Sequence, residues 1–411
     1  MLHGLILTTL LGVTAAWTPR SRAIARQGGE ILSERYLPNV DKIRGVNLGC
    51  QFIVERWMAE DSWARMGCQN YNDEWACTEG IGQAAADKAF DTHWDTWTTE
   101  DDIKEIAWIG LNTIRIPVGF WIYEDLVWDS EYYPRGGLPY LDRLVGWCKK
   151  HGIYVIIDLH GAPGSQSPNE QFTGHSIPVP EFYTAENYER ALKFLERMTN
   201  RIHTNANYTT VGMLQVLNEP VRTAAFRDKA ADMIENFYPQ AYQRITDMEE
   251  SLSVAKADRL HIQFMGTSWG AGNPREYLPS TEMAFFDAHR YLSFDNSITP
   301  MNKNGYITTA CQDHMGQDVV VGEWSLSVNS TLRNTAEFRY QGQETWYRAY
   351  WAAQAEAFER SDGWLFWSWK CDGTEDWRWC YKSAVRAGVI PNDASLAASL
   401  SPCDRYPPPG S

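Results

Sequence analysis

Two glutamates follow apolar stretches that have the composition of buried strands. Met213–Leu217 leads into Glu219, and Val319–Val321 leads into Glu323. A buried parallel strand reads as a short apolar run, and a carboxyl group at its end is costly unless it faces a site or is hydrogen-bonded. Because the carboxyl ends of parallel strands carry the chemistry in closed α/β barrels, the pattern predicts that both carboxyl groups enter one site.

Two carboxyl groups that face each other across a small cavity suit the hydrolysis of a glycosidic bond. One must hold a proton for the leaving oxygen, and the other must stay ionised to attack or to activate water. Further side chains are expected just past the strands: Arg115, His160, Asn218, His289, Tyr291 and Trp367. Arg115 and the Tyr291 hydroxyl are suited to keeping one glutamate charged, while apolar surroundings would raise the pKa of the other. This chemistry needs no cofactor and no metal, and the histidines lack the H-E-x-x-H zinc spacing.

Strand and helix patterns alternate along the chain and would position these residues. Strands are expected at 43–47, 111–116, 153–159, 213–217, 260–265, 283–286, 319–321 and 364–367, and helices around 103–109, 140–150, 185–201, 239–250 and 344–360. Thr99 and Asp102 form a capping box before the first of these helices, and Pro117 is expected to end the second strand. Eight such units predict a (β/α)8 TIM barrel. The alternative, a doubly wound sheet, would usually carry a Gly-rich phosphate turn after its first strand, and the sequence has none there.

The composition favours an uncharged ligand. The 411 residues include 37 basic and 52 acidic side chains, which gives a formal net charge of −15. This balance disfavours nucleic acid and anionic membrane surfaces, because binding to both depends on basic side chains. The chain also contains 19 Trp and 20 Tyr, whose flat faces suit packing against neutral sugar rings. We therefore expect a neutral polysaccharide as the partner, bound by a monomer.

Residues 1–16 have the pattern of a secretory signal peptide. Leu5–Val13 is a short apolar segment, and Thr14–Ala16 offers small residues for cleavage. The segment before Leu5 lacks Lys and Arg, so an N-terminal core strand is the alternative. Secretion would leave residues 17–411 as a single domain. In a secreted protein, Asn207 and Asn329 would be acceptors for N-glycosylation.

The eight cysteines fit an oxidising compartment. Two pairs that are close in polar sequence suggest local disulfides: Cys68 with Cys77, and Cys371 with Cys380. Cys311 and Cys403 are candidates for a third bridge. Cys148 lies on the apolar stripe of a predicted helix and is expected to be a buried free thiol.

A G-x-S-x-G motif, Gly266–Gly270, suggests the alternative of a serine hydrolase. In that class the serine stands on a sharp turn that opens directly into a helix. Here Gly270, Gly272 and Pro274 follow the serine, and these residues break helices. The motif therefore does not predict a nucleophile elbow.

The motifs at these strand ends resemble those of glycoside hydrolase family 5. They are Arg115-Ile-Pro, Asp158-Leu-His160-Gly-Ala-Pro-Gly-Ser-Gln, Asn218-Glu-Pro, His289-x-Tyr291, Gly322-Glu323-Trp and Trp367-x-Trp-Lys. The resemblance runs from about Ile43 to Trp369. It implies a TIM-barrel catalytic domain and a retaining mechanism, with Glu219 as acid/base and Glu323 as nucleophile. The other strand-end residues would be the supporting groups.

Within the family, the sequence is most similar to secreted fungal endo-β-1,6-glucanases, which act on cell-wall β-glucan. Gln51-Phe-Ile and Gly322-Glu-Trp-Ser-Leu-Ser-Val carry this similarity. The exo-β-1,3-glucanases of the family share most of the motifs and are the alternative, with Glu55 as the candidate for holding a terminal sugar. A non-catalytic glucan-binding protein is a remote alternative, since such a protein would normally have lost one carboxylate. An endo-acting enzyme needs separated aromatic platforms, for which the candidates are Trp57, Trp121, Trp269, Trp324, Trp369 and Trp377.

Overall fold

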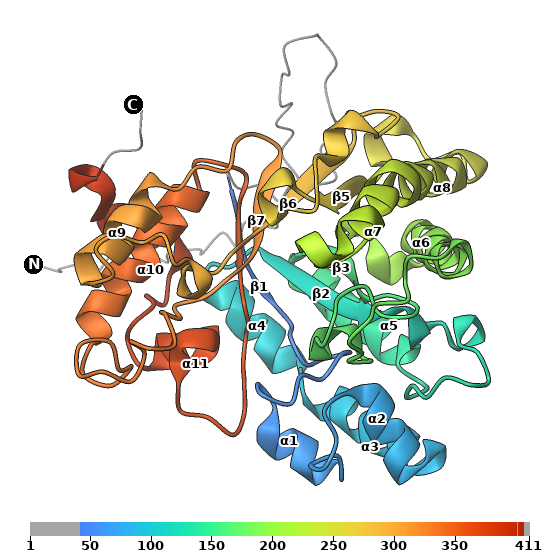
Figure 1. The fold of residues 1–411 in the computed structure, drawn as a ribbon, viewed down its shortest axis with the longest axis horizontal. Coiled ribbons are helices and arrows are strands. Elements are labelled where there is room, and N and C mark those ends of the chain that lie inside the picture. The colour runs from blue at the N-terminus through green and yellow to red at the C-terminus, as the bar shows by residue number, and fades with distance from the viewer. Residues whose placement is uncertain (1–41, 401, 407–411) are drawn as a thin grey trace, which may run out of the picture.

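Eight parallel strands close into a barrel in sequence order (Figure 1). They are β1 (Ile43–Asn47), β2 (Thr113–Gly119), β3 (Tyr154–Gly161), β4 (Val211–Gln215), β5 (His261–Met265), β6 (Ala284–Arg290), β7 (Val319–Trp324) and β8 (Gly363–Phe366). The structure is a computed structural model that describes residues 42–400 and 402–406, so the predicted signal peptide lies outside it. Because β8 pairs with β1, the sheet is closed, which confirms the TIM barrel and contradicts a doubly wound sheet.

Helices pack around the outside of the barrel (Figure 1). They are α1 (Glu60–Arg65), α2 (Glu74–Ile81), α3 (Gln83–Thr96), α4 (Glu100–Trp108), α5 (Leu138–Lys150), α6 (Ala185–Thr204), α7 (Arg227–Asp232), α8 (Tyr238–Ser251), α9 (Lys303–Gln312), α10 (Glu344–Phe358) and α11 (Tyr381–Arg386). The predicted capping box of Thr99 and Asp102 is present at the start of α4. Among the described residues, no helix combines the length and the apolar character that crossing a membrane requires.

The strands are apolar because both of their faces are covered. Every residue of β2, β3 and β7 is buried, and their outer faces pack against the helices. Inside the barrel, polar residues interrupt the apolar runs, among them Asn47, Arg115, Gln215 and Asp287, all fully buried. Since buried polar groups are costly without hydrogen bonds, such a layer must be held together by mutual contacts. It forms the floor beneath the two glutamates.

The prediction that the second strand ends at Pro117 is wrong. The strand continues to Gly119, and Pro117 pairs with Asp158 of β3. The Arg115 carbonyl accepts a hydrogen bond from the backbone nitrogen of Leu48, which lies just past the end of β1. Residues two apart in a strand point their backbone groups to the same side, so the nitrogen of Pro117 also faces β1. Because β1 has already ended and offers no further partner there, the absence of an N–H group in Pro117 loses no hydrogen bond of the sheet.

Three disulfides are present, as predicted: Cys68–Cys77, Cys371–Cys380 and Cys311–Cys403. Cys148 is a buried free thiol, also as predicted, and Cys50 is a second one. The Cys311–Cys403 bridge spans 92 residues and ties the C-terminal segment to α9. The other two bridges each join cysteines nine residues apart. One of them, Cys371–Cys380, fixes the loop that follows β8.

Candidate active site

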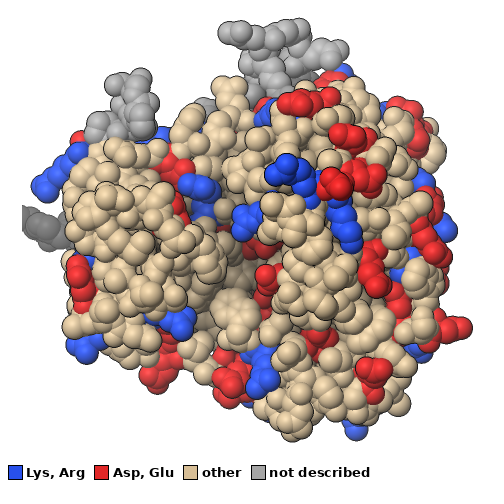
Figure 2. All heavy atoms as spheres, in the orientation of Figure 1, with Lys and Arg blue, Asp and Glu red and all other residues tan. Residues whose placement is uncertain are grey.

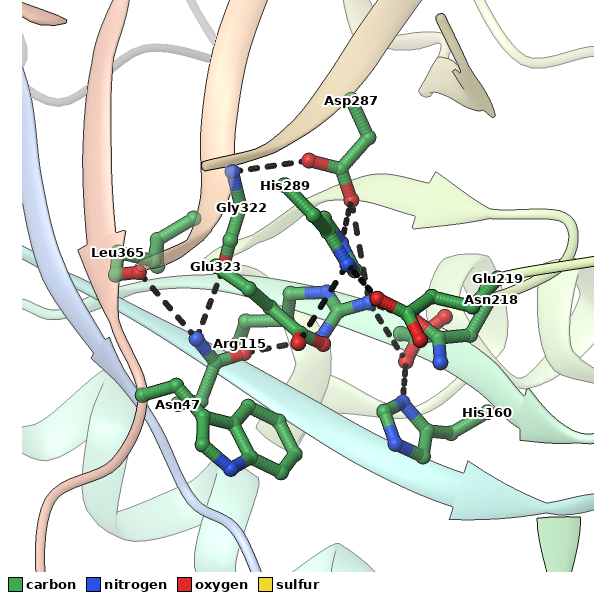
Figure 3. Close-up of polar contacts among 12 residues, drawn as sticks. Asn47, Arg115, His160, Asn218, Glu219, Asp287, His289, Gly322, Glu323 and Leu365 are labelled. Atoms are coloured by element: carbon green, nitrogen blue, oxygen red, sulfur yellow. Dashed lines mark hydrogen bonds and ion pairs between the residues drawn. The ribbon is translucent and has the colours of Figure 1, made fainter. Parts of the chain in front are cut away.

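Glu323 lies in β7 and is surrounded by hydrogen-bond donors (Figure 3). Arg115 Nη1 donates to Oε1 at 2.9 Å, and the Tyr291 hydroxyl donates to Oε2 at 2.8 Å. Burial raises the pKa of the Glu323 carboxyl above its ordinary value, and the charges of His289 and Arg115 oppose that effect. Since an ionised carboxylate only accepts hydrogen bonds, these donors stabilise the charged form of Glu323.

Glu219 stands four residues past the end of β4 and has fewer contacts. Its Oε1 lies 2.5 Å from His289 Nδ1, and its side chain is 16% exposed. The residue adopts a left-handed backbone with φ +36°, a conformation that costs roughly 1–3 kcal/mol for a residue with a side chain. This turn directs the carboxyl group toward β6 and β7 (Figure 3). Glu219 is thus the more accessible and the less constrained of the two acids.

Carboxylate oxygens of Glu219 and Glu323 lie within 4.8 Å of one another, and His289 lies between the two groups. Its Nδ1 is 3.4 Å from Glu323 Oε2, and its Nε2 is 3.1 Å from Asp287 Oδ2. Burial lowers the pKa of His289, but the charges of Glu323 and Asp287 and the hydrogen bonds to Asp287 and Glu219 outweigh it, so the pKa lies well above its ordinary value.

These three side chains also have the spacing of a metal site, with one ligand atom each. A histidine binds a metal ion through an unprotonated ring nitrogen. The raised pKa of His289 favours the imidazolium, in which both nitrogens carry protons. In that protonated form the arrangement is suited to positioning and transferring protons.

Arg115 connects most of the polar layer below the acids. Its guanidinium donates to Gln215 Oε1 at 2.8 Å, to Asn47 Oδ1 at 2.9 Å and to Asn218 Oδ1 at 2.7 Å, besides Glu323. It also lies 3.0 Å from Asp158 Oδ2. An arginine suits this position because its planar fork of donors serves several acceptors at once.

His160 and Trp367 form a second side of the site. The His160 ring stacks on the Trp367 ring at a centroid distance of 5.4 Å, and His160 Nδ1 bonds Asp158 Oδ2 at 2.7 Å. Asn218 is buried, and its Nδ2 has no partner among the described atoms. A buried donor without a partner is costly, so this group is available for a hydroxyl of a bound ligand.

Glu55 lies in the loop after β1 and is 8% exposed. It accepts a 2.9 Å bond from Trp57 Nε1. Burial raises its pKa to about 8, helped by the charges of Glu323, Glu170 and Glu219. Glu55 is therefore a neutral hydrogen-bond donor below that pH.

In Figure 2 the face of the molecule is hollowed between the half that carries α9, α10 and α11 and the half that carries α5 to α7, with acidic side chains along the hollow.

Comparison with known proteins places the chain in a family. The model of cellulase (glycosyl hydrolase family 5) matches residues 79–373. The chain is 46% identical over 408 residues to glucan endo-1,6-beta-glucosidase B of Emericella nidulans, which covers 97% of this chain and 98% of that protein. The chain belongs to glycosyl hydrolase family 5. The resemblance seen in its motifs is thereby confirmed, and the protein is a glycoside hydrolase.

Two further likenesses are more distant. The chain is 29% identical over 408 residues to glucan 1,3-beta-glucosidase 2 of Wickerhamomyces anomalus, which covers 89% of this chain and 91% of that protein. Among solved structures, the rutinosidase from Aspergillus niger superposes with a TM-score of 0.67 at 20% identity, over 85% of this chain and 99% of that one. The second likeness concerns the fold alone.

The barrel of this family 5 hydrolase brings the predicted residues to one mouth. His160, His289 and Glu323 are the penultimate residues of β3, β6 and β7, and Arg115 lies deeper, in the middle of β2. Asn218, Glu219, Tyr291 and Trp367 lie just past the ends of their strands. Sequence reasoning missed the buried carboxylates Asp158 and Asp287, which hold His160 and His289. Each precedes its histidine by two residues, and this spacing of polar groups within an apolar strand was the available signal.

The other sequence motifs lie outside this site. Ser268 is exposed in a short 3-10 turn, Thr267–Trp269, which ends at Gly270 and does not open directly into an α-helix, so it is not a nucleophile elbow. Asn207 is exposed and Asn329 is half-buried, and their glycosylation stays a prediction. Of the six predicted platforms only Trp57 is exposed, at 46%. The others, Trp121, Trp269, Trp324, Trp369 and Trp377, are buried and belong to the core.

Proposed function

We propose that the protein is a retaining endo-hydrolase of β-1,6-glucosidic linkages in cell-wall β-glucan. The observation that carries the mechanism is the separation of the carboxylate oxygens of Glu219 and Glu323, within 4.8 Å. Retention requires carboxyl groups roughly 5–5.5 Å apart, and inversion needs about 6.5–9.5 Å to leave room for a water molecule. One oxygen of each acid lies within 4.8 Å of the other, an approach that leaves little room for that water molecule and so supports retention.

In the first step, Glu323 Oε attacks the anomeric carbon of the bound sugar while the bond to the leaving oxygen breaks. Glu219 gives its proton to that oxygen, so the shortened chain leaves as a neutral alcohol and a covalent glycosyl–Glu323 ester remains. Arg115 and Tyr291 hold the attacking carboxylate in its charged form and fix its direction. As the ester forms, the charge on Glu323 disappears.

In the second step, Glu219 is a carboxylate and accepts a proton from a water molecule, whose oxygen attacks the anomeric carbon. The ester bond breaks, Glu323 recovers its charge, and Glu219 recovers its proton. The contact of Glu219 with His289 positions it for both roles. Asn218 Nδ2, which has no protein partner, donates to a sugar hydroxyl beside the reacting carbon. His160 and Trp367 support the same ring, and Glu55 donates to a hydroxyl farther out.

The likeness to known proteins supports the β-1,6 linkage. The chain is 46% identical to a relative named glucan endo-1,6-beta-glucosidase B, and only 29% identical to one named glucan 1,3-beta-glucosidase 2. The alternative function, exo-β-1,3-hydrolysis, would use Glu55 to hold a terminal sugar. A non-catalytic glucan-binding role is disfavoured, because both acids are present and hydrogen-bonded to the groups that their reaction needs.

Secretion is part of the same proposal. Residues 1–16 would be removed as the signal peptide, and 17–411 would form the catalytic domain, active as a monomer without cofactor or metal. The three disulfides support an oxidising compartment. N-glycans at Asn207 and Asn329 are expected in secreted material.

Product analysis tests the proposal. Purified protein is incubated with linear β-1,6-glucan and, in parallel, with β-1,3-glucan, and products are sampled from the first minutes. A ladder of β-1,6-linked oligosaccharides with retained anomeric configuration is expected. Glucose alone at early times, or faster attack on β-1,3-glucan, would instead establish the exo-β-1,3 function.

A further inference from the structure

Trp57 and Trp379 form an aromatic corner at the mouth of the barrel. Trp57 follows β1 and Trp379 belongs to the loop after β8, yet their ring centroids are 5.2 Å apart with an interplanar angle of 77°. Trp57 is 46% exposed, and Trp379 is half-buried. An exposed indole ring leaves apolar surface in water, so an exposed ring that adjoins a half-buried one beside an active site indicates a ligand surface.

Both rings are held in place. The Trp57 Nε1 donates to Glu55 at 2.9 Å, which fixes the ring plane. The Trp379 carbonyl accepts a hydrogen bond from the Ser368 backbone nitrogen at 2.7 Å. Cys380, which follows Trp379 in the chain, forms a disulfide with Cys371. The loop is thus fastened to the chain just after Trp367. A preorganised surface of this kind loses little conformational entropy when a ligand binds.

Contacts connect the corner to Glu323 rather than to Glu219. The Trp379 ring packs on the Tyr291 ring at 5.3 Å, and the Tyr291 hydroxyl donates to Glu323. Glu219 instead contacts His289, whose ring meets the Trp269 ring at a centroid distance of 5.7 Å, and Arg222 lies over the Trp269 ring at 3.8 Å. The nucleophile attacks the sugar that stays on the enzyme, whereas the acid faces the leaving sugar. The corner therefore belongs to the side that binds the retained part of the chain.

We propose that Trp57 and Trp379 bind two successive glucosyl rings of a β-1,6-glucan at a steep angle to each other. This rests on the proposed function and specifies how the linkage is recognised. A β-1,6 link places an extra rotatable bond between the rings, so consecutive rings can turn through the 77° that separates the two indole planes. A linkage that lacks the extra rotatable bond is stiffer and resists rotation of one sugar ring relative to the next by this angle. The fixed corner selects one of the many conformers of the flexible chain, which would otherwise have to be ordered on binding.

The test compares W57A and W379A with wild type on β-1,6-linked oligosaccharides of increasing length. Each variant should raise KM for the longer oligosaccharides about ten-fold, the upper range of one aromatic contact, while kcat stays within about three-fold. W379F keeps a ring and should recover much of the loss. W108A is the matched control, because Trp108 is 74% exposed at the C-terminal end of α4, which lies at the opposite end of the barrel from the active site. The KM of this variant should equal that of wild type.

The outcomes separate this inference from the proposed function. Wild-type cleavage of β-1,6-glucan combined with unchanged KM in W57A and W379A overturns the corner as a binding site. A fall in kcat without a change in KM also overturns it, because the rings would then act only through Tyr291. If wild type leaves β-1,6-glucan intact, the proposed function fails, and the linkage assigned to the corner fails with it.

Discussion

The surroundings of Glu323 and Glu219 differ in how strongly they fix a carboxyl group. The Glu323 side chain is 6% exposed and receives hydrogen bonds from Arg115 and Tyr291, whereas the Glu219 side chain is 16% exposed and is hydrogen-bonded to His289. A group that must carry one charge and attack from one direction benefits from rigid donors. A group that must give up a proton and later take one back needs access to substrate and water. The difference between the two environments thus supports the proposed roles, Glu323 as nucleophile and Glu219 as acid.

The largest effect is expected from Glu323→Gln. The amide cannot form the glycosyl ester, so turnover of every substrate should fall by at least about 10⁴-fold, beyond the usual contribution of a proton-transfer group. Hydrolysis rates on β-1,6-glucan and on an activated aryl β-glucoside measure the loss. Circular dichroism should remain that of wild type, because glutamine preserves the shape of the side chain. Substantial activity in this variant would contradict the assignment of the nucleophile.

Glu219→Gln should have a smaller and selective effect. Loss of a general acid costs about 10²–10⁴-fold on the natural polymer, because its leaving oxygen needs a proton. An aryl glucoside whose leaving group departs as a stable anion should form the glycosyl ester at nearly the wild-type rate, seen as a burst of the released phenol. If both substrates slow equally in the pre-steady state, the roles of the two glutamates would have to be exchanged.

Tyr291→Phe should move the pH profile by a smaller amount. The hydroxyl bonds the charged form of Glu323 and so lowers its pKa, which burial raises. Removing it raises that pKa further, so the acid limb of kcat/KM should shift to higher pH by about one unit, the equivalent of one bond to a charged group. The alkaline limb should stay in place, because the substitution does not touch the proton donor. An acid limb that does not move would assign that limb to another group.

The sequence predicted both glutamates and the order of all eight strands, because an apolar run that ends in a polar group is a strong local pattern. It did not predict which tryptophans would be exposed. Trp324 and Trp369 flank the site in the sequence but are buried, whereas Trp379, beside a cysteine, is only half-buried. In strands and loops that are covered on both sides, the alternation that separates inward from outward residues is absent. The roles of the carboxylates Asp158 and Asp287 were missed for a different reason: their two-residue spacing from the histidines was present, but the hydrogen bonds that give it meaning are seen only in the structure.

The smallest effect concerns the loop that carries Trp379. The Cys371–Cys380 and Cys68–Cys77 bridges each join cysteines nine residues apart, so chain entropy predicts a similar loss of about 3 kcal/mol in stability when either pair is replaced by serine. Only the first bridge adjoins Trp379. The C371S/C380S variant should therefore raise KM for long β-1,6-linked oligosaccharides by about three- to ten-fold, with little change in kcat.

The C68S/C77S variant is the control, because it lowers stability by the same mechanism and leaves the Trp379 loop closed. Thermal denaturation would show whether the two losses of stability match, and kinetics well below both midpoints would show whether KM separates them. An equal rise of KM in both variants would mean that general loosening of the barrel mouth, and not the position of Trp379, sets the affinity. A rise confined to C371S/C380S would place substrate affinity on the nucleophile side, where the loop after β8 holds its indole ring against Tyr291.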